Sequence, residues 1–298
     1  MQDIRTAFSR RDNALIQLIL LNVLVYATLV VVNAVLGLSG ADGARLVIAH
    51  WLELPSDLGV LLRHPWTVLT YAFVHRDFWH ILWNMLNLYW FGQLVREYLG
   101  DRRLVSLYVL GGLAGAAVFL LSYNLIPKLV DGPGALVVGA SGAVTAIIVA
   151  AATLLPDYTF SLILIGPVKI KWVAAVVVIL SLAGVNGGNA GGEIAHLGGA
   201  LLGFVFVKQL QAGRDLGRPV QAVGNFFANL ASRRPAMRVS TPRRAEPVAA
   251  TASSSGKKPV PNQPLQDEID LILDKISRSG YESLSKDEKQ KLFRASQQ

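Results

Sequence analysis

Long apolar runs alternate with short polar segments over the first two thirds of the chain. The runs cover residues 15–38, 78–98, 104–125, 139–155, 172–185 and 194–210. A helix rises about 1.5 Å per residue, so about 20 apolar residues cross a hydrocarbon core roughly 30 Å thick. The pattern therefore predicts an all-α, multi-pass membrane protein with six membrane-spanning helices.

Basic residues indicate which ends of these spans face the cytoplasm. They stand before the first run, after the second and after the sixth: Arg5, Arg10, Arg11; Arg96, Arg102, Arg103; and Arg214, Arg218, Arg233, Arg234, Arg238, Arg243, Arg244. The loop at 186–192 has none and is expected outside. Both termini are therefore expected in the cytoplasm. The first run is too long for a signal peptide and lacks a small-x-small cleavage site, so we expect a retained span.

Composition narrows the possible chemistry. Of the 298 residues, 52% are hydrophobic and 16% are charged, whereas soluble domains carry about 25% charged residues. The net charge of +8 lies largely beside the spans and in the tail, which favours a lipid bilayer over nucleic acid as partner. The chain has no cysteine, which excludes disulfides, thiol catalysis and cysteine-bound metals. We expect no cofactor and no metal.

The pattern divides the chain into four parts. These are a cytoplasmic N-terminus (1–13), the six-span domain (14–211), a basic and largely disordered linker (212–264) and a small helical hairpin (265–298). In the hairpin, apolar residues recur at helical spacing, Gly280 interrupts them, and Ser285 and Glu288 have the spacing of a capping box. We interpret this hairpin as a docking element for a cytoplasmic partner.

Four other segments connect or follow the spans. Residues 39–66 either lie partly in the outer membrane interface or form an ordinary external loop. Residues 219–232 either form an interfacial amphipathic helix beside the basic cluster or belong to the linker. Residues 156–171 are expected to be a loop. The Pro-, Ala- and Ser-rich stretch at 235–264 has the composition of a disordered linker.

The string from Gly139 to Thr145 opens the fourth span and contains Ser141 between small residues. In one interpretation, the small residues only let helices approach closely, as is common in membrane bundles. In the other, Ser141 is a nucleophile, and glycines leave space for a substrate carbonyl. A serine hydroxyl needs a neighbouring base to take its proton. The second interpretation therefore requires a base at the same membrane depth.

Such a base is available because spans two, four and six all begin on the external side. His80, Ser141 and His196 each lie about one turn from the start of their spans, and Asn84 shares a helix face with His80. Polar groups inside spans are costly and usually functional. Their convergence favours a serine nucleophile, a histidine base and oxyanion donors. Glu193 precedes His196 by three residues and could reach toward it, but we expect it to stay at the wet interface, which favours a Ser–His dyad over a triad.

Three motifs together resemble the rhomboid intramembrane serine proteases. They are His75-x4-His80-x3-Asn84, Gly139-Ala140-Ser141-Gly142 and Ala195-His196-x-x-Gly199-x3-Gly203. Their order, spacing and topology fit that family, and the similarity covers about residues 14–211.

The resemblance implies a role for each of these residues. Ser141 would be the nucleophile and His196 the general base, while the Ser141 N–H, His80 and Asn84 would form the oxyanion hole. Gly199 and Gly203 would let span six pack on span four. Further supporting positions are His75, Gly139 and Gly142. Substrates would be transmembrane helices cut near their external end. The 39–66 segment would be a membrane-embedded loop, and span five or its neighbouring loop would gate lateral access.

One position departs from the family pattern. Many rhomboids carry an aromatic residue four positions after the serine, stacked on the catalytic histidine, where this chain has Thr145. His196 must then be oriented by the Thr145 hydroxyl or by another aromatic ring.

The resemblance also suggests a source and leaves two rival functions. The segment 189–193 and the C-terminal hairpin resemble those of rhomboids from Bacteroidetes-type bacteria, which implies a bacterial inner membrane. The alternative function is a weak or inactive rhomboid-like protein that binds transmembrane helices. A transporter is disfavoured because no inverted repeat is apparent.

Overall fold

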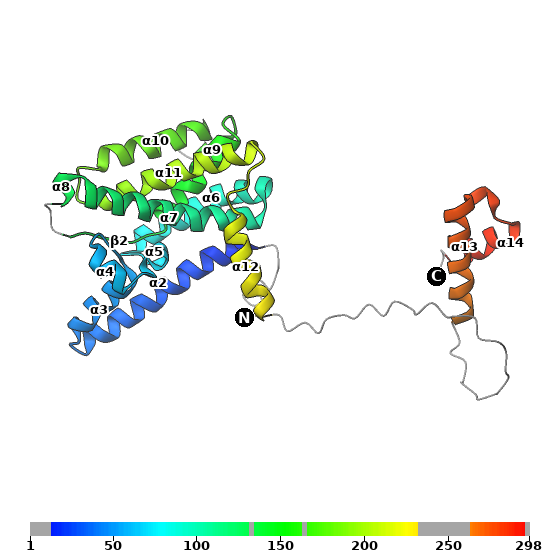
Figure 1. Ribbon diagram of the computed structural model, residues 1–298, viewed down its shortest axis with the longest axis horizontal. Helices are drawn as coiled ribbons and strands as arrows, with labels where there is room; N and C mark the ends of the chain where they lie inside the picture. Colours follow the sequence, from blue (N-terminus) through cyan, green and yellow to red (C-terminus); the bar gives the residue numbers. More distant parts are fainter. Residues whose placement is uncertain (1–12, 131–133, 163–165, 232–262, 296–298) are drawn as a thin grey trace. The chain divides into compact units, whose positions relative to one another are not determined.

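The computed structural model describes residues 13–130, 134–162, 166–231 and 263–295 (Figure 1). The chain divides into two compact units, Met1–Arg234 and Pro235–Gln298. We describe each unit by itself.

The first unit is built from helices. They are α2 (Ala14–Leu38), α3 (Asp42–Leu52), α4 (Leu58–Arg63), α5 (Thr67–Thr70), η1 (Tyr71–Phe73), α6 (Phe78–Leu99), α7 (Asp101–Leu125), α8 (Pro127–Val130), α9 (Ser141–Leu154), α10 (Ile170–Gly184), α11 (Ala190–Gln211) and α12 (Arg218–Ala231). The six runs predicted from the sequence correspond to α2, α6, α7, α9, α10 and α11, so each is confirmed as a helix.

Length and apolar composition single out three described helices as able to cross a membrane: α2, α7 and α11. The shorter helices α9 and α10 are also apolar. Helix α6 has 22 residues, but its tryptophan, histidine and amide side chains lower its hydropathy. The exposed faces of α2 and α10 carry large apolar side chains, including Val31, Val35, Ile179 and Leu180. Such surfaces suit contact with lipid rather than with water.

Helix α9 lies at the centre of this unit, in contact with α6, α7, α10 and α11. Helix α7 lies beside α11 (Figure 1). The backbones of α9 and α11 touch, because a Cβ on Gly199 would collide with the carbonyl oxygen of Gly142 and one on Gly203 with that of Ala146. Small residues permit such close contact between helices in a membrane. The central position leaves α9 almost wholly buried.

The segment 39–66 is ordered by local contacts. It contains α3, α4 and strand β1 (Leu54–Pro55), which pairs antiparallel with β2 (Leu136–Val137). The Trp66 indole N–H donates to the carbonyl of Trp51 over 2.8 Å, and the His64 ring lies 5.2 Å from the Trp51 ring. This segment is therefore more ordered than an ordinary external loop.

Residues 156–171 contain a structure that the sequence analysis did not predict. Strands β3 (Thr159–Leu162) and β4 (Gly166–Lys169) form an antiparallel hairpin where a plain loop was expected. The Asp157 carboxylate accepts hydrogen bonds from Lys169 and Lys171, each over 2.9 Å. These hydrogen bonds hold the pKa of Asp157 at about 2. The expectation of a plain loop was wrong, because residues Thr159–Leu162 pair with Gly166–Lys169.

The end of the first unit is also helical. Residues 219–232 lie almost entirely in α12, which exposes Val223, Phe226, Phe227 and Leu230. This confirms the helix and favours an amphipathic element over linker. Arg103 Nε donates to Asp215 over 2.9 Å, which ties the start of α7 to the residues before α12. The disordered linker expected at 235–264 falls outside the described residues up to residue 262.

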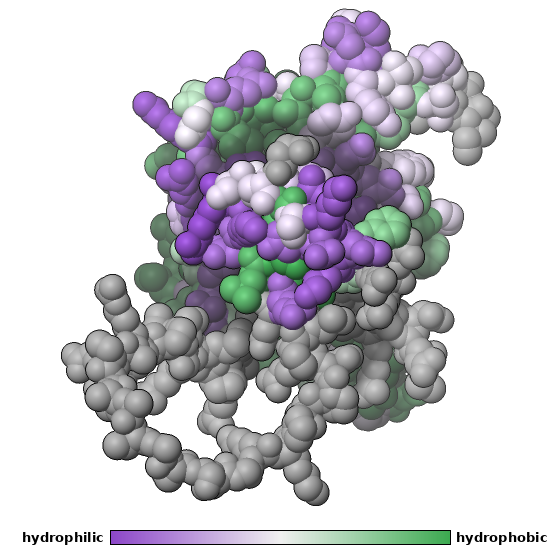
Figure 2. All heavy atoms as spheres, turned by 90° about the vertical axis from the view of Figure 1, so that its right-hand side faces the viewer, coloured by the Kyte–Doolittle hydropathy of each residue, from purple (hydrophilic) through white to green (hydrophobic). Residues whose placement is uncertain are grey.

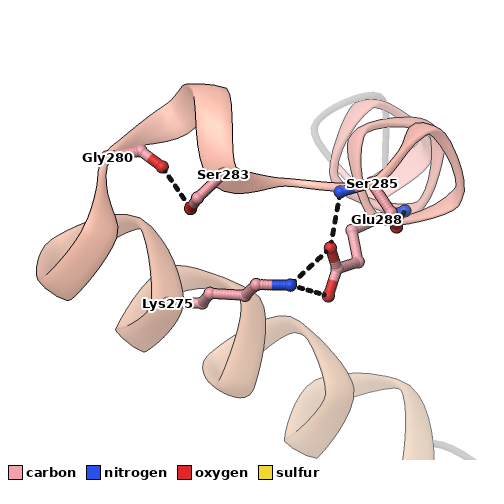
Figure 3. A network of polar contacts seen from close by, with 5 residues as sticks. All are labelled: Lys275, Gly280, Ser283, Ser285 and Glu288. Carbon is pink, nitrogen blue, oxygen red and sulfur yellow. Dashed lines mark hydrogen bonds and ion pairs between the residues drawn. The ribbon is translucent and has the colours of Figure 1, made fainter.

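The second unit is the predicted helical hairpin, with α13 (Gln263–Ser279), η2 (Tyr281–Ser283) and α14 (Lys286–Ala295). Gly280 has φ 78° and ends α13. The Ser285 N–H donates to Glu288 over 2.7 Å and the Glu288 N–H to Ser285 Oγ over 3.3 Å, which confirms the capping box (Figure 3). Lys275 bonds both oxygens of Glu288 over 2.9 Å. The visible surface of this unit is largely hydrophilic (Figure 2).

Candidate active site

A cavity of about 530 Å³ opens among α6, α9, α10 and α11. The polar residues that line it include His80, Asn84, Ser141, Thr145 and His196. A cavity of this size, in which apolar side chains such as Val144 and Ile148 lie beside converging polar groups, can hold a ligand. All five of these polar residues were singled out from the sequence.

Ser141 is the first residue of α9, and the turn before it explains its setting. Gly139 has φ 125°, a conformation that side chains rarely adopt. A Cβ there would lie 2.7 Å from His80 Nε2 and 3.5 Å from Ser141 Oγ. The Gly139 N–H donates to the Tyr71 carbonyl over 2.9 Å and fixes the turn. Because residue 139 has no side chain, both the His80 ring and the Ser141 hydroxyl can lie close to the backbone of Gly139.

The start of α9 supplies donors beside the serine. The first intrahelical hydrogen bond runs from the Val144 N–H to the Ala140 carbonyl over 2.8 Å. The N–H groups at the start of a helix have no intrahelical acceptor, and the helix dipole there favours negative charge. An oxyanion formed near Ser141 would meet these donors.

His80 and Asn84 reach the cavity from α6. The helix begins at an Asp77 cap, whose carboxylate accepts from the His80 N–H over 2.9 Å. The Asn84 side-chain N–H₂ donates to the His80 carbonyl over 2.9 Å, which fixes the amide at the cavity wall. An amide N–H₂ has two hydrogens, so one remains for a ligand.

His75 is buried and does not line the cavity. Its ring meets the His80 ring edge-on with centroids 5.0 Å apart, and 5% of its surface is exposed. Neither ring nitrogen of His75 has a hydrogen-bond partner within the described part of the chain. The geometry thus makes His75 a neighbour of His80 that lines a second cavity, of about 230 Å³, rather than the one that holds Ser141.

His196 on α11 has a different environment from the one expected. Its Nδ1 atom lies 3.0 Å from Ser181 Oγ of α10 and 3.1 Å from Glu193 Oε2. Glu193 was expected to stay away from His196, but its side chain is only 23% exposed and contacts the imidazole. Spacing of three residues puts both side chains on one helix face. Ser181 was missed, because nothing in the sequence indicates which α10 residue faces α11.

Thr145 lines the cavity and is 4% exposed. Across the residues that the structure describes, no aromatic ring stacks on His196 and no hydrogen bond joins His196 to Thr145. Both expected ways of orienting the imidazole are therefore wrong. Glu193 and Ser181 are the groups that hold it.

Backbone contact brings Ser141 and His196 into the same neighbourhood. Gly142 follows Ser141, Ala195 precedes His196, and a Cβ on Gly142 would lie 3.3 Å from the Ala195 carbonyl oxygen. The two side chains therefore start from touching turns of α9 and α11 and face the same cavity.

The fold and the cavity together define a class of protein. It is a membrane protein built as a bundle of apolar helices, with a serine, a histidine and amide donors around one cavity. Residues 62–211, about half of the 298, match the rhomboid domain. The chain belongs to the rhomboid family. Residues 263–298 match a second family of unknown function (DUF6576).

The chain is similar to several rhomboid proteins of organelles. It is 32% identical over 161 residues to RHOMBOID-like protein 12, mitochondrial, of Arabidopsis thaliana, covering 50% of this chain and 47% of the relative. It is 30% identical over 217 residues to Rhomboid protein 1, mitochondrial, of Saccharomyces cerevisiae, covering 68% and 58%. It is 29% identical over 139 residues to Presenilin-associated rhomboid-like protein A, mitochondrial, of Danio rerio, covering 46% and 35%.

The chain thus spans about half the length of the curated relatives it matches. These relatives do not support the expected Bacteroidetes-type origin, because their names place them in eukaryotic organelles.

Proposed function

We propose that this protein is an intramembrane serine endopeptidase that cuts transmembrane helices of other membrane proteins with Ser141 and His196. The observation that carries the proposal is the common cavity of Ser141, His196, His80 and Asn84, built where α9 and α11 are in backbone contact. Membership of the rhomboid family supports the same reaction class.

In the proposed reaction, His196 Nε2 takes the Ser141 proton while Oγ attacks the carbonyl carbon of the scissile peptide. The Asn84 amide, the His80 ring and the Ser141 N–H stabilise the oxyanion. The C–N bond then breaks, and the amine leaves with the proton from His196. A water molecule, activated in turn by His196, hydrolyses the acyl ester and restores the serine.

The proposed membrane setting has six spans, formed by α2, α6, α7, α9, α10 and α11, with both termini in the cytoplasm. The basic residues after α6 and α11 support this orientation. Trp79 and Trp83 of α6 and Val177 of α10 line the same cavity. A substrate helix would therefore reach Ser141 from the bilayer between α6 and α10. A bacterial inner membrane and a cytoplasmic partner for the hairpin remain predictions.

The test is cleavage of a single-span substrate in proteoliposomes. Wild type is compared with Ser141→Ala and His196→Ala, each checked for folding by its thermal unfolding. We expect two fragments from wild type alone, cut near the external face. Cleavage by Ser141→Ala at the wild-type rate would show the assignment of the nucleophile to be wrong.

A second candidate is a weak or inactive rhomboid-like protein that binds transmembrane helices. The observation that favours it is Thr145, which leaves His196 without a stacked ring. In that case all three proteins would retain the intact substrate helix in a pull-down and release no fragments.

A further inference from the structure

The Nδ1 atom of His196 faces the carboxylate of Glu193, which packs closely against α10. The side chains of His196 and Glu193 are 18% and 23% exposed, so water competes only weakly for their contact. The Glu193 N–H donates to the Asn189 carbonyl over 3.1 Å, as expected in the first turn of α11. The backbone position of Glu193 is therefore fixed by the helix, and its side chain extends toward the imidazole three residues later.

Helix α10 leaves room for this carboxylate. A Cβ on Gly184 would lie 2.8 Å from Glu193 Cγ and 3.0 Å from Cδ, so a larger residue there would displace the Glu193 side chain. One turn earlier on the same face of α10, Ser181 Oγ lies 3.0 Å from His196 Nδ1. Ser181 is buried, with 2% of its surface exposed. Glu193 and His196 therefore pack against the α10 surface at Gly184 and Ser181, where the side chains are absent or small.

The chemistry of the contact selects one tautomer of His196. An ionised carboxylate only accepts hydrogen bonds, so the Nδ1 atom beside it must carry the hydrogen. The lone pair is then on Nε2, the nitrogen that a general base needs to turn toward Ser141. When Nε2 takes the serine proton, the carboxylate also stabilises the imidazolium that forms, as the aspartate does in soluble serine proteases.

We propose that Glu193, together with Ser181, is a positioning residue that holds His196 in the Nδ1–H tautomer, so that the site works as a Ser141–His196–Glu193 triad. This inference rests on the proposed protease function and concerns its base. It also explains how the site tolerates Thr145. A stacked ring would orient the imidazole by contact with its face, whereas here Glu193 and Ser181 orient it by contacts with Nδ1.

The main test compares Glu193→Gln with wild type in proteoliposomes, with kcat and KM measured for the same substrate. Glutamine keeps the shape, but its N–H₂ can donate to Nδ1 and stabilise the wrong tautomer. We expect kcat to fall by roughly 10²-fold, within the range that general acid–base catalysis contributes, with KM unchanged. Glu193→Asp restores the carboxylate and should recover part of kcat, whereas Ser181→Ala should lose less than Glu193→Gln.

A second variant disturbs the contact between Glu193 and His196 without changing either residue. Gly184→Ala keeps Glu193 but places a methyl group where its side chain lies, so kcat should fall again with KM unchanged. The matched control is Asp157→Asn, which removes an exposed carboxylate of the β3–β4 segment that contacts Lys169 and Lys171, and should keep both constants at wild-type values.

A small fluorophosphonate separates this inference from the proposed function, because its reaction with Ser141 needs the activated serine but no substrate helix. Slower labelling of Glu193→Gln and Gly184→Ala than of wild type supports the triad, even if wild type cleaves no helix and the protease proposal fails. Equal labelling and equal kcat in wild type and Glu193→Gln would overturn the triad, as would a raised KM with unchanged kcat. Wild type that neither labels nor cleaves would overturn both proposals.

Discussion

Single residues at this site are fixed in two ways, by their own backbone and by neighbouring helices. Asp77 caps α6 and aims His80, and Gly139 adopts the positive φ that brings the turn against the His80 ring. The cap and the glycine turn are each local in the sequence, and Gly139 and His80 were singled out from their motifs, although the Asp77 cap was not. The setting of His196 depends instead on α10. It was predicted wrongly, because the sequence does not specify which residues of two spans meet.

Asn84 offers the clearest prediction at this scale. One hydrogen of its side-chain N–H₂ is used by the His80 carbonyl, and the other is free to bind the oxyanion. Asn84→Ala should lower kcat by roughly 10²-fold with little change in KM, the usual effect of removing one oxyanion donor.

The measurement is the rate of substrate cleavage at saturating substrate. Asn87→Ala is the matched comparison, since Asn87 lies one turn further along α6 and donates to the Trp83 carbonyl over 2.8 Å. We expect a much smaller loss there. Equal losses in both variants would indicate a general effect on α6 and not an oxyanion donor.

At the scale of elements, helices were predictable and pairings were not. Apolar runs of near membrane length specify helices because each backbone group is satisfied within its own segment. The β3–β4 hairpin escaped prediction because it depends on pairing between two four-residue segments. The capping box of Ser285 and Glu288 was predictable because both partners lie within one turn.

The contact of α9 with α11 gives a prediction about stability. Gly199→Ala places a methyl group against the Gly142 carbonyl oxygen, so the helices must separate. We expect a loss of roughly 1–3 kcal/mol in the free energy of unfolding, as for other overpacked sites. It can be measured by denaturant titration in detergent micelles.

The control substitution is Gly224→Ala in α12, where a Cβ would meet no atom within 4 Å. Alanine is the better helix former, so this variant should be no less stable than wild type. If Gly199→Ala were equally neutral, the close approach of α9 and α11 would not limit the stability of the bundle.

At the scale of the whole molecule, the chain joins a membrane-embedded site to a separate hairpin. Every residue that lines the cavity belongs to the unit Met1–Arg234, while the hairpin lies in Pro235–Gln298 and matches a different family. The hairpin has its own capping box and a small apolar centre at Ile272 and Leu284, each 6% exposed. The two units can therefore be altered one at a time.

Removal of residues 263–298 should leave Ser141-dependent cleavage of a model substrate within about 2-fold of wild type, a change of less than about 1 kcal/mol, because every residue that lines the cavity belongs to the first unit. Ile272→Asp is the companion variant, since it places a charge in the centre of the hairpin and keeps the chain length. Both should cleave in proteoliposomes as wild type does. A large and equal loss in both would contradict this independence, and would mean that the folded hairpin acts on the membrane-embedded site.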